Sequence, residues 1–423
     1  MLPATRRRVV ITGLGVVAPN GIGKVAFWQA CLAGRSGVRP ITSFDASTLP
    51  THIAGEIPNF QPEDLGLTSE ECAHMDRGTQ LALAAAYLAL QDAHLLDAFT
   101  EEDGDATGVC MGAAMASIAE GESLWVHLTH SGTHPLKTLT EDVVSDSVFL
   151  TNASAAAIAA HFQLHGPSVV ISTGCSSGAD AIGQAFWAIQ EGRADRMLAG
   201  GADSSISYGS INVFSIIGAL STRNEEPEQA SRPYDAKRDG FVMAEGAGVL
   251  VLEERELALA RGAHMYAEVA TFNSNSNAYH MTALPADGAP LQQLLRQALE
   301  EAAITPAQLD YVNSHGSSTR ANEVAETVAY KAVFGEHAYQ IPISATKSLI
   351  GHTQGAAGAI EAIVTALAID EQMLPPTINQ QMADPECDLD YVPNVARQSA
   401  VHIALTHSSG FGGVSTALIL MRP

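Results

Sequence analysis

The chain has 423 residues, of which 46% are hydrophobic and 16% are Asp, Glu, Lys or Arg, a composition typical of a large folded α/β protein with an extensive buried interior. Its 46 acidic and 22 basic residues give a net charge of −24 at pH 7, and this negative field disfavours binding to nucleic acid and to anionic membranes. The longest apolar runs, such as residues 82–90, are about half as long as a membrane span.

The cysteines are five in number, widely spaced and without a CxxC pair. This pattern predicts neither a disulfide framework nor a zinc site, and we expect no metal and no cofactor. A cytoplasmic, reducing setting fits such a chain. The cysteines stand at positions 31, 72, 110, 175 and 387.

β-Branched apolar runs alternate with helical stretches, a pattern that predicts strand–helix–strand units and buried, mostly parallel or mixed sheets. We expect strands over 8–15, 106–112, 168–173, 196–202, 246–254, 267–273, 309–315, 341–346, 402–408 and 416–421. The two halves of the chain, which meet near 255–265, each carry strands, a helix and a polar turn, and this hints at a duplication.

Two helices are indicated by apolar spacing and by end signals. One runs from Asp76, its N-cap, to about Leu96, and the other from about Thr353 to Asp370, with two prolines soon after its end. We interpret 117–147, rich in His, Thr, Ser and Gly, as an insertion or cap without clear periodicity. The acidic run at 101–105 predicts a solvated surface turn.

Cys175 stands where a β-branched run stops and a helical pattern begins, in VVISTGCSSGADAIGQAF. The unpaired N–H groups of a helix start stabilise a thiolate at such a position. A cysteine that only fills space in the core has no need of this junction. We therefore predict that Cys175 is a nucleophile.

Two histidines, His315 and His352, each follow a predicted strand, and strand ends are where open α/β sheets place their chemistry. Two neutral imidazoles near one thiolate suit donation of N–H bonds to a carbonyl oxygen that becomes negatively charged. Lys347 supplies a positive charge that keeps the imidazoles neutral and orients Glu326. The GFGG turn at 410–413 permits close approach of the backbone, and a backbone N–H there could form an oxyanion hole with that of Cys175.

These stretches together resemble the elongating β-ketoacyl-ACP synthases of the thiolase superfamily, over nearly the whole chain. The details HGSSTRANE, GEHAYQIPIS and DPECDLDYVP are closest to the catalytic ketosynthase subunit of type II polyketide synthases. The motifs that carry the resemblance are STGCSSGADAIG, NSHGSSTRANEVAE, SATKSLIGHTQGAAGAIE, GFGG and ASRPYDAKRDGFVMAEGAG.

The resemblance implies a thiolase fold, in which two similar α/β halves pack as a layered α-β-α-β-α sandwich. We place the halves at 1–258, with the cap insertions and the nucleophile, and at 259–423, with the two histidines. It further implies that Cys175 takes an acyl chain from an acyl carrier protein, that malonyl-ACP loses CO2, and that the resulting carbanion attacks the Cys175 thioester. The functional residues that it implies are Cys175, His315, His352 and Lys347 for catalysis, Phe411 and Gly412 for the oxyanion hole and gating, Glu326, Glu323 and Thr319 for support, and Met115 for the acyl pocket.

The sequence departs from the family pattern at two places, and alternative functions stay open at this point. Glu323 stands where the family usually has Asp, and THSS precedes GFGG where the fatty-acid branch has NSF. The alternatives are a housekeeping fatty-acid elongating synthase and a non-catalytic chain-length partner subunit. The partners expected are an acyl carrier protein and either a second copy of the chain or a chain-length subunit, with no nucleic acid and no membrane. Lys237 and Arg238 are candidates for carrier docking, and structural ion pairs are the alternative for them.

Overall fold

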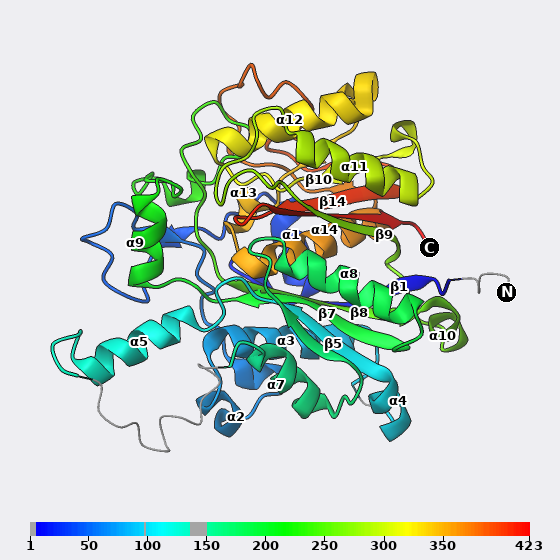
Figure 1. Cartoon of the computed structure of the whole chain (residues 1–423), viewed down its shortest axis with the longest axis horizontal. Coiled ribbons are helices and arrows are strands. Elements are labelled where there is room, and N and C mark those ends of the chain that lie inside the picture. Colours follow the sequence, from blue (N-terminus) through cyan, green and yellow to red (C-terminus); the bar gives the residue numbers. More distant parts are fainter. Residues whose placement is uncertain (1–5, 97–98, 136–149) are drawn as a thin grey trace.

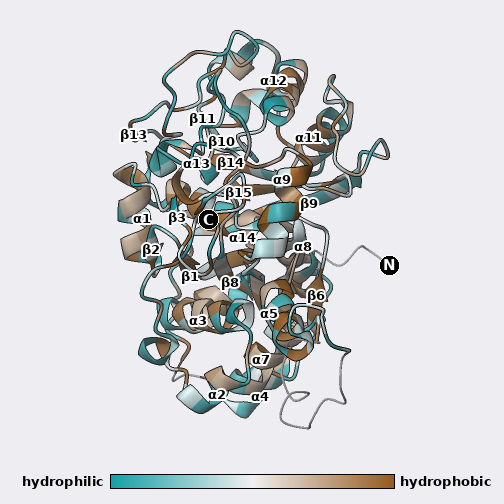
Figure 2. Cartoon of the chain, turned by 90° about the vertical axis from the view of Figure 1, so that its left-hand side faces the viewer, coloured by the Kyte–Doolittle hydropathy of each residue, from teal (hydrophilic) through white to brown (hydrophobic). Residues whose placement is uncertain are grey.

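Two central helices, α8 (Ser177–Gln190) and α14 (Ala357–Glu371), lie between two layers of β-strands in the computed structural model, which describes residues 6–96, 99–135 and 150–423 (Figure 1). Further helices cover the outer faces of both strand layers, so five layers stack as α-β-α-β-α (Figures 1 and 2). The predicted layered sandwich is confirmed.

The strands of the first half are β1 (Val9–Ala18), β5 (Thr107–Gly112), β6 (Ser168–Ile171), β7 (Arg196–Asp203) and β8 (Gly246–Glu254). Those of the second half are β9 (Ala267–Ser276), β10 (Tyr311–Asn313), β11 (Ile343–Ser344), β14 (Ile403–Ser409) and β15 (Val414–Met421). All ten expected strands are therefore present. The remaining strands are the short pieces β2 (Gly21–Ile22), β3 (Arg39–Pro40), β4 (Ile53–Ala54), β12 (Met373–Leu374) and β13 (Arg397–Gln398).

The two halves have the same strand order. In the first half the order is β1-β8-β7-β5-β6, and in the second it is β9-β15-β14-β10-β11. In both, the first two pairings are antiparallel and the last two are parallel. The halves join where the start of β1 pairs with β9. The two halves therefore repeat one strand order. The boundary between residues 258 and 259 stays a prediction.

The outer helices pack one face on the sheet. On the first half these are α3 (Arg77–Asp92) and α7 (Ala153–Phe162), and on the second α11 (Ala289–Glu301) and α12 (Arg320–Phe334). The Asp76 carboxylate accepts a hydrogen bond of 3.0 Å from the N–H of Thr79, so the predicted N-cap is confirmed. The helix ends at Asp92, a turn earlier than expected.

The central helices pack closely because small residues face each other. Every residue of α14 from Ala357 to Ile369 is buried, as expected of a helix that lies between two sheets. A Cβ on Gly178 would lie 2.8 Å from the carbonyl oxygen of Gly355, which is closer than packed atoms come. This close approach of α8 to the start of α14 brings together the turns that carry Cys175 and His352.

Two sequence interpretations are wrong. The acidic run at 101–105 lies in a short helix, α4 (Glu101–Ala106), because Thr100 forms a capping box with Asp103. Part of the supposed irregular cap forms the helix α5 (Ile118–Thr129), which contacts α9 (Tyr208–Ile216) and extends from the body of the molecule (Figure 1). Residues 136–147 of that cap lie outside the described ranges.

The other helices are α1 (Lys24–Leu32), α2 (Ser69–Ala73), α10 (Arg255–Ala260) and α13 (Lys347–Ile350). Among the described residues, no helix has the length and apolar character needed to cross a membrane.

Candidate active site

Cys175 lies in the turn between β6 and α8, four residues after the strand ends and two before the helix begins. Gly174 before it has a φ of +62°, and a Cβ there would lie 2.9 Å from the carbonyl oxygen of Phe411. Glycine is therefore required both for the backbone conformation and for the close approach of the GFGG turn. The predicted junction of strand and helix is confirmed.

Burial dominates the ionisation of Cys175. Loss of water raises the pKa of its thiol to about 11, while Lys347 and a backbone hydrogen bond from Phe411 lower it and Asp203 and Glu361 raise it. Burial therefore opposes the thiolate that the sequence expected the helix start to favour. Ionisation needs further donors directed at the sulfur atom.

His315 follows β10 and is buried. Its Nδ1 lies 3.2 Å from the side-chain nitrogen of Lys347, which also donates to the His315 carbonyl oxygen at 2.7 Å. A lysine ammonium has only donors, so Nδ1 must accept, and the ring proton of neutral His315 is on Nε2.

His352 follows the short helix α13 and not a strand directly, which corrects the sequence expectation. Its tautomer is the same as that of His315 for a different reason. The backbone N–H of Gln354 donates to its Nδ1 at 3.1 Å. The ring proton of His352 is therefore also on Nε2.

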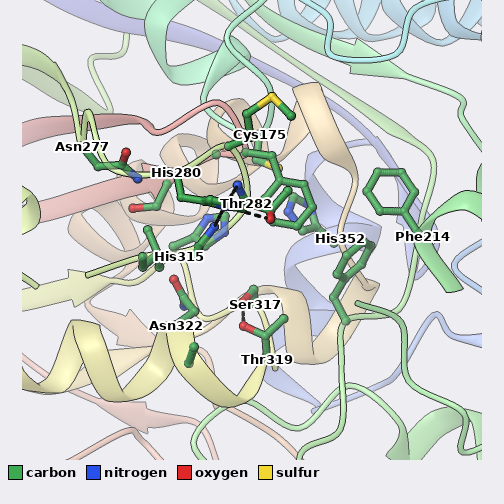
Figure 3. Close-up of a pocket in the computed structure, with 18 of the residues that line it drawn as sticks. Cys175, Phe214, Asn277, His280, Thr282, His315, Ser317, Thr319, Asn322 and His352 are labelled. Carbon is green, nitrogen blue, oxygen red and sulfur yellow. Dashed lines mark hydrogen bonds between the residues drawn. The ribbon is translucent and has the colours of Figure 1, made fainter. Parts of the chain in front are cut away.

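Both imidazoles are neutral. Burial, with the charge of Lys347 second, holds the pKa of His315 and that of His352 well below the usual value of 6.5. The two rings lie 5.4 Å apart, centre to centre, and Figure 3 shows them beside Cys175. The site thus offers two Nε2–H donors near one thiol, as the sequence predicted.

The partner of Lys347 differs from the sequence interpretation. Its ammonium pairs with the carboxylate of Glu361 inside the protein. Glu326, which we expected Lys347 to orient, instead accepts hydrogen bonds of 2.6 Å from the Tyr234 hydroxyl and 3.1 Å from the N–H of Gly316. Glu326 therefore holds the backbone just after His315.

The other two predicted supporting residues, Glu323 and Thr319, lie at the start of α12, the helix that also carries Glu326. The carboxylate of Glu323 accepts from the N–H of Ser318 and lies 3.4 Å from the guanidinium of Arg238. Thr319 is the N-cap residue of α12, and its hydroxyl lies 3.0 Å from that of Ser317. Ser317 and Thr319 both line the cavity shown in Figure 3.

The GFGG turn closes over Cys175. Gly412 has a φ of +89°, and its N–H donates to the carbonyl oxygen of Met281 at 2.7 Å, so this N–H is not free to bind an oxyanion. The Phe411 N–H is the group directed at the sulfur. A Cβ on Gly410 would lie 3.0 Å from the backbone nitrogen of Cys175, so glycine leaves that nitrogen uncovered.

A cavity of about 750 Å³, partly open to solvent, contains the site. Cys175, His315, His352, Phe411 and Gln354 are among the residues that line it. Met115, expected in an acyl pocket, does not line this cavity; its N–H donates to Asp203 at 3.1 Å instead. Its role in acyl binding stays a prediction.

Sequence reasoning missed three buried polar residues at the site. Glu361 is a carboxylate within an otherwise apolar helical run, which was the available signal. Asp203 accepts N–H bonds from the loop after β5 and from Gly355, and Gln354 lies beside Cys175. No local pattern in the sequence indicates these contacts, because they join segments far apart in the chain.

Lys237 and Arg238, the two candidates for carrier docking, have different environments in the structure. Arg238 is 4% exposed and pairs with Glu323 and Asp384, so the alternative of structural ion pairs holds for it. Lys237 is exposed. Arg238 cannot contribute to a docking surface while these ion pairs bury it.

Comparison with known proteins decides the family. Residues 6–258 match the family described as Beta-ketoacyl synthase, N-terminal domain, and residues 266–381 match Beta-ketoacyl synthase, C-terminal domain. The chain belongs to the β-ketoacyl synthase family. As a β-ketoacyl synthase it is an acyltransferase of the condensing type.

Similar proteins cover both branches of this family. The β-ketoacyl synthase is 44% identical to the tetracenomycin polyketide synthase ketoacyl synthase alpha subunit of Streptomyces glaucescens, over 99% of this chain and 97% of that protein. It is 40% identical to 3-oxoacyl-[acyl-carrier-protein] synthase 2 of Coxiella burnetii, over 99% of both proteins.

Two solved structures share its fold. One is the AntDE:AntF complex, a type II polyketide synthase acyl-carrier protein bound to its ketosynthase, with a TM-score of 0.91, 40% identity and coverage of 99% of this chain and 100% of that one. The other is the ishigamide ketosynthase/chain length factor, with a TM-score of 0.90, 33% identity and the same coverage.

Proposed function

We propose that this β-ketoacyl synthase is the catalytic ketosynthase of a type II polyketide system, which joins a Cys175-bound acyl chain to a malonyl group on an acyl carrier protein with loss of CO2. The observation that carries the proposal is the pair of neutral imidazoles that share one cavity with the Cys175 thiol. A hydrolase needs one such base, whereas two N–H donors suit an enolate oxygen.

In the first stage, the sulfur of Cys175 attacks the thioester carbonyl of the acyl-ACP. The Phe411 and Cys175 N–H groups stabilise the oxyanion that forms. The carrier thiol then leaves with the proton that Cys175 has lost, and the acyl chain remains on Cys175.

In the second stage, malonyl-ACP places its thioester oxygen between His315 and His352. Both Nε2–H groups donate to this oxygen while the carbon–carboxylate bond breaks, CO2 leaves and an enolate forms. The enolate carbon attacks the Cys175 thioester, a carbon–carbon bond forms, and Cys175 leaves as a thiolate.

The partners follow from the same proposal. Both substrates arrive on an acyl carrier protein, and the Ser317 and Thr319 hydroxyls in the cavity are suitable partners for the polar arm that carries them. The second subunit is either another copy of this chain or a chain-length subunit, as in the ishigamide ketosynthase/chain length factor. We place the reaction in the cytoplasm, where Cys175 stays reduced.

The test is incubation with acyl-ACP, followed by peptide mapping, and then addition of malonyl-ACP with mass analysis of the product. We expect the acyl group on Cys175 and a β-ketoacyl product, and Cys175→Ala should give neither. An adduct mainly on Cys31, Cys72, Cys110 or Cys387 would contradict the assignment.

The fatty-acid branch is a second candidate, because the similarity to the Coxiella burnetii synthase is almost as high. An enzyme that elongates saturated acyl groups but refuses β-oxo acyl groups would belong to that branch. Cys175, His315 and His352 together disfavour a non-catalytic partner subunit.

A further inference from the structure

Gln354 is a buried polar residue that the mechanism above does not use. It is 3% exposed, lines the cavity and places its Oε1 3.9 Å from the sulfur of Cys175, where it accepts from the thiol. Its Nε2 is buried and has no hydrogen-bond partner within the described part of the chain. A buried unpaired N–H group is unfavourable, so a native structure that keeps one usually has a use for it.

The backbone of Gln354 is held on both sides. Its N–H donates to Nδ1 of His352 at 3.1 Å, and the N–H of the next residue, Gly355, donates to Asp203 at 2.6 Å. Its φ of +50° lies in the left-handed region, which residues other than glycine rarely adopt. The main chain is therefore fixed beside Cys175, and only the side chain is free to turn.

The contact between Oε1 of Gln354 and the sulfur of Cys175 turns from attractive to repulsive when the thiol loses its proton. A carboxamide oxygen suits an S–H group but repels a negatively charged sulfur. Half a turn about the last side-chain bond exchanges Oε1 and Nε2, which have nearly the same shape. The unpaired N–H donor then faces the sulfur, and hydrogen bonds to charged groups are about twice as strong as neutral ones.

We propose that Gln354 is a catalytic residue whose amide turns to donate an N–H to the sulfur of Cys175 whenever that atom is negatively charged. It acts when Cys175 attacks and again when Cys175 leaves as a thiolate, and the second role rests on the proposed function. The amide of Gln354 thus adds a donor for the sulfur that stays available while the Phe411 and Cys175 N–H groups bind the carbonyl oxygen.

The other charged and titratable groups around the sulfur do not replace this donor. Lys347 favours the thiolate but is paired with Glu361, while Asp203 and Glu361 both oppose it. The imidazoles of His315 and His352 are neutral.

The test is the rate of alkylation of Cys175 by iodoacetamide as a function of pH, followed by peptide mapping. It needs no acyl group and no carrier protein, so it separates this inference from the proposed function. Gln354→Met removes both amide atoms and keeps an unbranched side chain of similar length. Gln354→Glu keeps the shape but offers only acceptors and adds negative charge.

We expect Gln354→Met to be alkylated at Cys175 about tenfold more slowly than the wild type at neutral pH, with the profile moved to higher pH. Gln354→Glu should be slower still. Thr282→Val, which removes another hydrogen-bonding group from the same cavity, should keep the wild-type profile. Equal or faster alkylation of both Gln354 variants, with Cys110 and Cys387 still protected as in the folded protein, would overturn the proposal.

Discussion

At the residue scale, the site depends on two imidazoles whose tautomers are fixed by their neighbours. We expect His315→Ala or His352→Ala to slow the decarboxylation of malonyl-ACP by about 100-fold or more, the usual effect of losing one oxyanion donor. Acylation of Cys175 should fall less, because the Phe411 N–H is unchanged. Release of CO2 and formation of acyl-enzyme are the two measurements, and loss of acylation with full decarboxylation would contradict these roles.

The same imidazoles predict a flat pH profile. The pKa values of His315 and His352 are lowered, so both rings are neutral above those values and gain a proton only in acid. Decarboxylation should therefore not titrate with the ordinary histidine midpoint between about pH 6 and 8. A drop centred near the ordinary value would show that at least one ring is protonated in the working enzyme. Cys175→Ala, which retains both rings, is the matched protein for this measurement.

At the scale of elements, the contact between α8 and the start of α14 aligns the two halves of the site. We expect Gly178→Ala to lower the free energy of unfolding by about 1–3 kcal/mol, because its Cβ would lie 2.8 Å from the Gly355 carbonyl oxygen and 3.0 Å from the Cβ of Ala359. Urea denaturation measures this change.

Gly121→Ala is the control for this substitution. Gly121 lies in α5, and a Cβ there meets no atom within 4 Å. Alanine should therefore stabilise this helix by up to about 1 kcal/mol. If both variants changed stability equally, close packing between α8 and α14 would not be the reason for glycine at position 178.

At the scale of the whole molecule, the first half ends in an edge strand with exposed apolar side chains. β6 is the last strand of the sheet, and Val169 on it is 48% exposed. Exposed edges of this kind pair with other chains. We therefore expect the proposed second subunit, a copy or a chain-length subunit, to bind along β6.

We expect Val169→Lys to shift the purified protein, with its partner subunit if it has one, from dimer toward monomer in analytical ultracentrifugation. Val395→Lys is the control, because Val395 is 73% exposed and follows Asn394, which lies beside Gly34 at the end of α1 and not on the sheet edge formed by β6. An unchanged dimer in Val169→Lys, or equal dissociation in both variants, would place the interface elsewhere.

Local patterns in the sequence predicted the strands and the central helices, and they singled out Cys175, His315 and His352, which the structure brings together in one cavity. Periodicity of apolar residues and the switch from strand to polar turn are local features, so they can be read from a continuous stretch of chain. The same local reasoning failed at 101–105, where a capping box and not net polarity decided the structure.

Which side chains these residues contact depends on the tertiary packing. Lys347 pairs with Glu361 and not with Glu326, Arg238 is buried and not a docking residue, and burial opposes the thiolate that the helix start was expected to favour. Gln354 became visible only as an unpaired amide beside Cys175. The physical reason is that pKa values, ion pairs and unsatisfied donors depend on burial and on neighbours from distant segments, which the packing of the two halves alone brings together.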